Sequence, residues 1–134
     1  MAIERIGLER TGAGGQSLPF SPAVRAGDFV FVSGQVAMND RGEIEPGGIE
    51  AQTRRTMDNI VKVLDQAGCT LGDVAKVSVW LDDTRDFWTF NRIYAGYFPD
   101  GAPARSTVQA SLMVDAKIEI DVVAYKPVSK PGSG

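Results

Sequence analysis

The segment 117–125, KIEIDVVAY, constrains the fold more than any other stretch of the chain. Successive side chains of a β-strand point to opposite faces of the sheet. One face of this segment is therefore fully apolar, with Ile118, Ile120, Val122 and Ala124, and the other is mixed, with Glu119, Asp121, Val123 and Tyr125. Such a strand needs a sheet that is covered on its apolar side, which predicts a layered fold of helices packed on a sheet.

Two segments have the 3.6-residue periodicity of amphipathic helices. In residues 50–67 one apolar stripe contains Met57, Ile60, Val61 and Leu64, and Gly68 supplies a C-terminal stop. In residues 86–98 one stripe contains Phe87, Phe90, Asn91, Tyr94 and Phe98. We expect Thr84 to cap this second helix. Asn91 should be at least partly buried, so it needs hydrogen-bond partners.

Strand patterns occupy 3–10, two short runs that turn at 26–28 (the second running from 29 to about 33), 74–81, 105–112 and 117–125. The order is three strands, helix, strand, helix and two strands. Right-handed crossovers place both helices on the same face of one mixed six-stranded sheet, an α+β fold. We predict one domain over residues 1–127 and a disordered tail over 128–134.

The second face of the sheet also carries apolar side chains. In the strand that begins at Phe29, Val30 and Val32 point to one side, and Phe29 and Phe31 point to the other. Two helices cannot cover both faces, and a contiguous apolar patch usually marks an interface. We therefore predict a homo-oligomer that packs this open face against itself. Trp80 and Trp88 are further candidates for an interface.

Side-chain parity also places two charged residues. If Val108, Ala110 and Leu112 face the core, Arg105 lies on the face away from the helices, as does Glu119. If residues 113–116 form a simple hairpin, Arg105 pairs near Ala124, and Glu119 lies roughly 17 Å further along. The two side chains could then act together only across a subunit boundary.

Composition excludes several kinds of chemistry. The 134 residues include no histidine and one cysteine, Cys69, which rules out Ser-His-Asp and Cys-His catalysis, histidine-ligated zinc and an internal disulfide. The net charge of −3 makes nucleic-acid binding an unfavourable hypothesis. No apolar run reaches the ~20 residues of a membrane span, so we expect a cytoplasmic protein without a membrane partner.

Five segments together form a specific pattern, although each alone would be weak: PFSPAVRAGDFVFVSGQ, QTRRTMDNIVKVLDQAGCTLGDVAKVSVWL, FNRIYAGYF, PARSTV and KIEIDVVAY. In their order and spacing the chain resembles the RidA family, also called YjgF/YER057c/UK114, over nearly its whole length. The resemblance implies a chorismate-mutase-like fold that assembles as a homotrimer, with three sites in clefts between subunits. It also implies hydrolysis of reactive enamines and imines, such as 2-aminoacrylate, to 2-oxo acids and ammonia, with no metal or organic cofactor.

The same resemblance implies roles for individual residues. Arg105, within PARS, matches the family's substrate-carboxylate arginine, and Glu119, within KIEI, matches its water-positioning glutamate. Ser33 and Gly34, within SGQ, would line the site with a hydroxyl and a backbone amide. Asn91, within FNRIY, matches the family's site asparagine.

Two positions depart from the best-characterised deaminases of the family. Phe20 stands where a tyrosine is usual and should form a wall of the pocket, and Thr107 replaces a cysteine that often follows PARS. The missing phenol leaves open a deaminase for another substrate, such as 2-aminomuconate. A noncatalytic protein that binds a small carboxylate at the same cleft is a second alternative. A ribonuclease or translation inhibitor is a third, against which the net charge counts.

Overall fold

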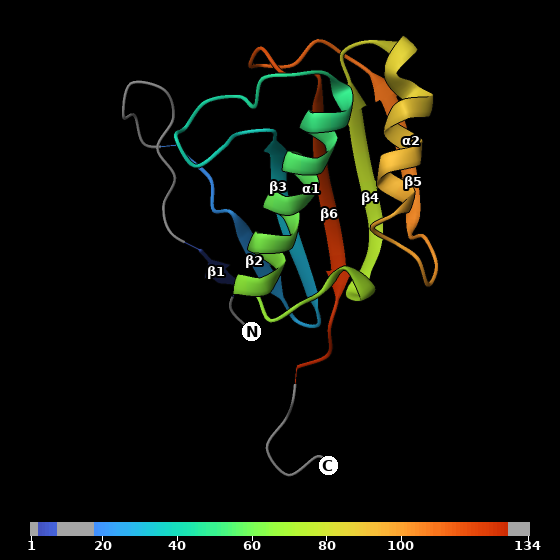
Figure 1. Ribbon diagram of the computed structural model, residues 1–134. Coiled ribbons are helices and arrows are strands. Elements are labelled where there is room, and N and C mark those ends of the chain that lie inside the picture. The colour runs from blue at the N-terminus through green and yellow to red at the C-terminus, as the bar shows by residue number, and fades with distance from the viewer. Residues whose placement is uncertain (1–2, 8–17, 129–134) are drawn as a thin grey trace.

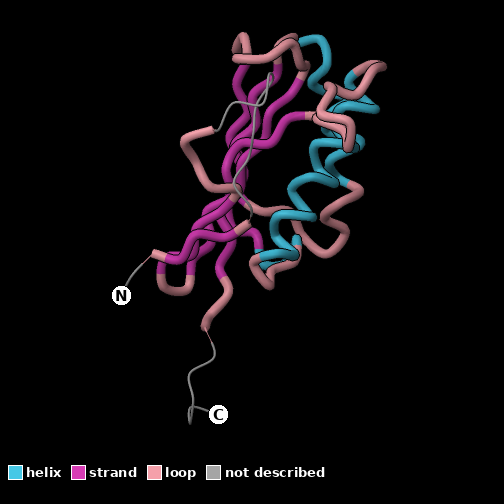
Figure 2. Tube along the Cα trace, turned by 90° about the vertical axis from the view of Figure 1, so that its left-hand side faces the viewer, coloured by secondary structure: helices cyan, strands magenta, loops and turns pink. Residues whose placement is uncertain are grey.

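A computed structural model describes residues 3–7 and 18–128 and contains one six-stranded sheet with two helices (Figure 1). The elements are β1 (Glu4–Ile6), β2 (Ala23–Ala26), β3 (Phe29–Val36), α1 (Ile49–Gln66), β4 (Val74–Leu81), α2 (Phe87–Ala95), β5 (Ala104–Gln109) and β6 (Ile118–Tyr125). The strand order is β1-β2-β3-β6-β4-β5, with β4 and β5 parallel and the other neighbours antiparallel. Both helices lie on one face of the sheet (Figure 2), which confirms the predicted α+β fold.

Several element boundaries differ from the sequence-based predictions. β1 ends at Ile6, and residues 8–17 and 129–134, which include part of the first predicted strand and most of the predicted tail, lie outside the described residues. A 3₁₀ turn, Thr84–Asp86, precedes α2, and its cap is the Asp83 carboxylate, which accepts from the Arg85 N–H. The prediction that Thr84 caps the second helix was therefore wrong.

The core lies between the helices and the covered face of the sheet. The four apolar side chains of β6 that alternate from Ile118 to Ala124 are buried, as predicted, against Met57, Ile60 and Leu64 of α1. Val61 was predicted to share that stripe but is exposed at its edge. None of the described helices combines the length and the apolar character needed to cross a membrane.

The predicted hairpin between the last two strands was wrong, because β4 lies between β5 and β6. In the parallel register of β4 and β5, Arg105 lies beside Val77 and Thr107 beside Val79. Paired residues point to the same face. Since Val77 and Val79 are buried in the core, Arg105 and Thr107 point to the helix-covered face rather than away from it.

The prediction that Arg105 faces away from the helices was therefore wrong. β5 is an edge strand that turns polar side chains to the covered face and Val108 to the open face. Val108 is 51% exposed on the open face, while Arg105 lies beneath α2. The open face is otherwise as expected. Phe29, Phe31 and Tyr125 are each 44–47% exposed, with the ring centroids of Phe29 and Tyr125 5.3 Å apart. The homo-oligomer that would cover these rings remains a prediction.

Candidate functional site

The guanidinium of Arg105 lies among aromatic rings contributed by α2. Its Cζ is 4.9 Å from the ring centroid of Tyr94, 5.2 Å from that of Phe90 and 5.8 Å from that of Phe87. These distances allow cation–π attraction to each ring. Among residues 3–7 and 18–128, no carboxylate or carbonyl oxygen is paired with this half-buried cation. Aromatic packing thus holds the side chain in place and leaves its hydrogen-bond donors available.

Arg105 opens into a pocket of about 550 Å³ between α2 and the start of β5. The rest of the lining consists of Trp88, Asn91, Tyr94, Ala95, Phe98, Ala102 and Pro103. Asn91 therefore shares a pocket with Arg105. It is half-buried, but within the described part of the chain its amide has no hydrogen-bond partner, contrary to what its burial predicts. A planar cation and a free amide at one pocket are suited to an anion with hydrogen-bonding oxygens.

Glu119 lies on the opposite, open face, over a β-bulge in β3. The register of β3 with β6 shifts between Val32 and Gln35, so Ser33 and Gly34 form the bulge. A Cβ added at Gly34 would overlap the Glu119 carboxylate and lie 3.0 Å from its Cδ. Glycine at this position allows the carboxyl group to lie directly against the backbone of the bulge.

Ser33 connects this bulge to the segment that carries Phe20. The Ser33 hydroxyl donates to the carbonyl oxygen of Ser21 at 2.6 Å, and its N–H donates to the carbonyl oxygen of Pro22 at 2.9 Å. Ser33 thus fixes the segment that carries Phe20, whose exposed ring lines a separate pocket with Ser21 and Pro22. Its hydroxyl proton is committed to a structural bond, so it can offer a ligand only its lone pairs.

The carboxyl group of Glu119 retains its proton more readily than an ordinary glutamate. Burial, and after it the charge of Asp121, raise the pKa of Glu119 above its usual value. Burial also raises the pKa of Asp121, against the effects of a hydrogen bond from Ser78 and the charge of Lys76. Glu119 has no ion-pair partner among the described residues. An unpaired carboxyl group with a raised pKa is suited to exchanging protons with water or a ligand.

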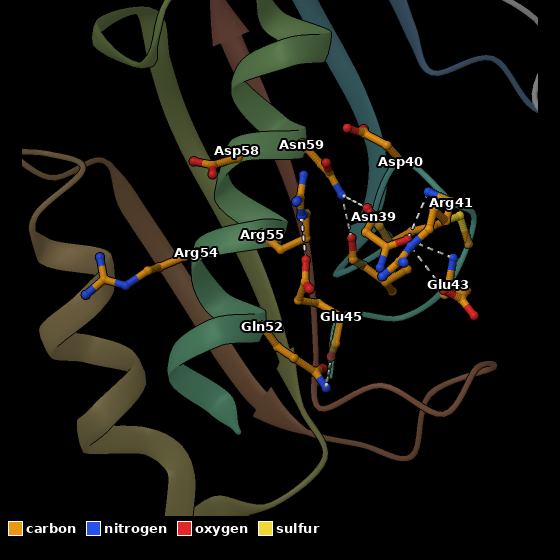
Figure 3. Close-up of polar contacts among 12 residues, drawn as sticks. Asn39, Asp40, Arg41, Glu43, Glu45, Gln52, Arg54, Arg55, Asp58 and Asn59 are labelled. Atoms are coloured by element: carbon orange, nitrogen blue, oxygen red, sulfur yellow. Dashed lines mark hydrogen bonds and ion pairs between the residues drawn. The ribbon is translucent and has the colours of Figure 1, made fainter. Parts of the chain in front are cut away.

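Helix α1 fixes β3 and β6, the two strands that carry Ser33, Gly34 and Glu119 (Figure 3). The Asn59 amide donates to the carbonyl oxygens of Val36 and Met38, at the end of β3, at 3.0 and 2.9 Å. Gln52 donates to the carbonyl oxygen of Glu45 at 3.3 Å and accepts from the N–H of Lys117, just before β6, at 2.8 Å. Two buried or half-buried amides thereby hold the exit of β3 and the entry of β6 to one helix.

One chain does not bring the two groups together. Glu119 and Val108 both pair with Trp80, so Arg105 is two strands and three residues away, about 14 Å at ~4.8 Å between strands and ~3.3 Å per residue. The side chains also leave opposite faces of the sheet. The predicted separation within one chain is therefore confirmed, although for a different reason than the predicted hairpin.

Thr107 belongs to the Arg105 side of the sheet. It lines a neighbouring pocket with Thr84, Phe87 and Gln109, and its buried hydroxyl has no hydrogen-bond partner within the described residues. Sequence reasoning missed the aromatic cradle of Arg105 and the position of Trp88 at its pocket. The available signal was the aromatic stripe of residues 86–98, which was used only to predict a helix and the partial burial of Asn91.

Comparison with known proteins finds relatives that match most of the chain. A family model described as Endoribonuclease L-PSP matches residues 14–126. A RutC family protein of Pyrococcus horikoshii is 46% identical over 110 residues, which cover 81% of this chain and 87% of that protein. A Mus musculus protein named 2-iminobutanoate/2-iminopropanoate deaminase is 36% identical over 110 residues, which cover 81% of this chain and 82% of that protein.

Solved structures show the same relationship in three dimensions. The crystal structure of Escherichia coli TdcF with bound serine has a TM-score of 0.81 and 33% sequence identity to this chain. The match covers 92% of this chain and 98% of TdcF. Sequence and fold agree over nearly the whole domain, and the chain therefore belongs to the RidA family, also called YjgF/YER057c/UK114.

Proposed function

We propose that this protein hydrolyses reactive 2-imino and 2-enamine acids to 2-oxo acids and ammonia, without a cofactor. The observation that carries the proposal is the half-buried guanidinium of Arg105, which faces a pocket and has no anionic partner in the described part of the chain. The cost of keeping a cation partly desolvated is offset when a ligand carboxylate binds it. The deaminase name of the mouse relative supports the same substrate class.

The chemistry needs positioning and proton transfer more than an activated nucleophile. Arg105 would hold the substrate carboxylate through two parallel charge-assisted hydrogen bonds. Glu119 would orient a water molecule and accept its proton as the water oxygen bonds to the imine carbon. Glu119 would pass that proton to the imine nitrogen, which gives a carbinolamine. It would then accept the carbinolamine's hydroxyl proton as the C=O bond forms and deliver it to the nitrogen that leaves as ammonia when the C–N bond breaks. The raised pKa of Glu119 favours the steps in which it accepts a proton, because a more basic carboxylate binds the proton more readily.

Because these two residues lie on opposite faces of one sheet, we propose that the site is shared between chains of a homotrimer. Arg105, Asn91 and Thr107 would come from one subunit, and Ser33, Gly34, Glu119 and Phe20 from its neighbour. The exposed rings of Phe29, Phe31 and Tyr125 support this assembly, since they provide an apolar surface for a second chain.

The proposal is tested by trapping the imine. A dehydratase generates 2-aminoacrylate or 2-aminocrotonate in situ, semicarbazide competes for the imine, and release of the free 2-oxo acid is measured. We expect acceleration by the wild type, a loss of at least ~10²-fold in Arg105→Ala and Glu119→Ala, and little change in Arg92→Ala. Arg92 is a suitable control because it is exposed on α2 and has no partner within the described residues.

Mixed oligomers test the shared site directly. If Arg105→Ala and Glu119→Ala chains are unfolded together and refolded in equal amounts, about one quarter of shared sites would combine an intact Arg105 with an intact Glu119. Recovery of about that share of wild-type activity is expected. If the mixture stays as inactive as its components, each site is built within one chain. Absence of acceleration by the wild type, with carboxylate binding retained, would favour a noncatalytic binding protein instead.

A further inference from the structure

Trp88 is the most exposed aromatic side chain described in this protein, and it lies at the pocket of Arg105. It is 78% exposed and contacts Phe87 edge to face, with centroids 5.3 Å apart. Trp88, Asn91 and Ala95 are spaced at i, i+3 and i+7 on α2 and line the same pocket. The indole thus stands about one helical turn from the amide of Asn91.

The polar and apolar parts of this pocket have different uses. Arg105 and Asn91 provide the available polar groups, whereas Trp88, Ala95, Phe98, Ala102 and Pro103 form apolar walls. The Tyr94 hydroxyl is itself buried within the protein. A three-carbon imino acid has six non-hydrogen atoms, of which only the methyl carbon is available to pack against these walls. Once its carboxylate is bound to Arg105, such a substrate would make little contact with the apolar walls.

We infer that the preferred substrates are 2-imino acids with a large apolar or aromatic side chain, which packs against Trp88 while the carboxylate binds Arg105. This inference rests on the proposed function and names its substrate class. An apolar side chain that leaves water at this wall would gain binding energy without any new hydrogen bond, whereas an imine with only a methyl group would gain almost none. Trp88 is on this reasoning a specificity-determining residue and takes no part in proton transfer.

Binding of stable 2-oxo acids, the products of the proposed reaction, tests the inferred side-chain preference without requiring catalysis. Calorimetry would compare phenylpyruvate with pyruvate on the wild type, Trp88→Ala, Trp88→Phe and Arg105→Ala. We expect phenylpyruvate to bind the wild type at least tenfold more tightly than pyruvate. Trp88→Ala should remove most of that preference while leaving pyruvate within about threefold, Trp88→Phe should restore part of it, and Arg105→Ala should weaken both ligands. Equal affinities in the wild type, or an equal loss of both ligands in Trp88→Ala, would overturn the inference.

Kinetics then separate this inference from the proposed function. An amino-acid oxidase would supply the 2-imino acids of phenylalanine and of alanine, with semicarbazide as the competitor. Trp88→Ala is expected to raise KM roughly 10- to 100-fold for the phenylalanine-derived imine, and by a clearly smaller factor for the alanine-derived imine. Hydrolysis of neither imine, together with a retained preference for phenylpyruvate, would overturn the deaminase function and support the ligand class. Faster hydrolysis of the alanine-derived imine would overturn the ligand class and support the deaminase.

Discussion

Replacing Gly34 by alanine should disable the proposed catalytic carboxylate without unfolding the protein. The new Cβ would overlap the carboxylate of Glu119 and lie 3.0 Å from its Cδ and 3.3 Å from its Cγ. Gly34 is not among the glycines with positive φ, so the backbone accepts alanine without strain. The side chain of Glu119 must therefore move away from the bulge.

The two energetic effects on folding nearly cancel. Forcing Glu119 toward a less favourable rotamer costs about 0.5–1.5 kcal/mol, and the loss of chain entropy in the unfolded state returns about 0.4–1 kcal/mol. Tm should stay within about 4 °C of the wild type. A catalytic group displaced by about 1 Å can cost ~10²-fold, so kcat for imine hydrolysis should fall by that order. The pKa of Glu119 should also fall toward its ordinary value as the carboxyl group leaves its partly buried position.

The assay is semicarbazide competition, with a thermal melt recorded on the same preparation. Gly48→Ala is the matched control, because Gly48 has a φ of −89° and an added Cβ there has no neighbour within 4 Å. Full activity in Gly34→Ala would refute the proposed role of the Glu119 position. A loss of activity accompanied by a large fall in Tm would show that the bulge serves folding rather than catalysis.

Three further substitutions test the energetics around the site. Glu119→Gln should raise Tm at pH 7 but not below pH ~4.5. A carboxyl group whose pKa is raised in the folded state contributes stability at low pH, and this stability is lost as the pH rises through that pKa. Melts that shift equally at both pH values would contradict this prediction. Thr56→Val should stabilise the fold by about 1 kcal/mol in urea, because its buried hydroxyl has no hydrogen-bond partner among the described residues; a loss of stability would argue against this. Gln52→Leu should lower the free energy of unfolding by about 1–3 kcal/mol, since the N–H of Lys117 loses its acceptor. Gln66 is exposed on the same helix, so Gln66→Leu should change the stability little. Equal effects of the two substitutions would contradict the bridging role of Gln52.

Local periodicity was sufficient for most of the fold. The alternation in 117–125 and the stripe of 50–67 correctly predicted β6, α1 and the faces that they bury, because a residue's place in a strand or helix fixes its direction relative to its neighbours. The same reasoning failed for β5. An edge strand carries a cation on its covered side and Val108 on its open side, so hydrophobicity alone assigned its two faces in reverse.

The sequence by itself determined the class of fold, the absence of histidine chemistry and, through its family resemblance, the residues to examine. Only the tertiary structure decided how those residues are grouped. The strand order separates β5 from β6. Arg105 of β5 lies against the Tyr94 ring of α2, and a bulge places Gly34 beneath Glu119. These are contacts between different strands and helices, and no periodic pattern within a single segment can encode which other segment it will meet.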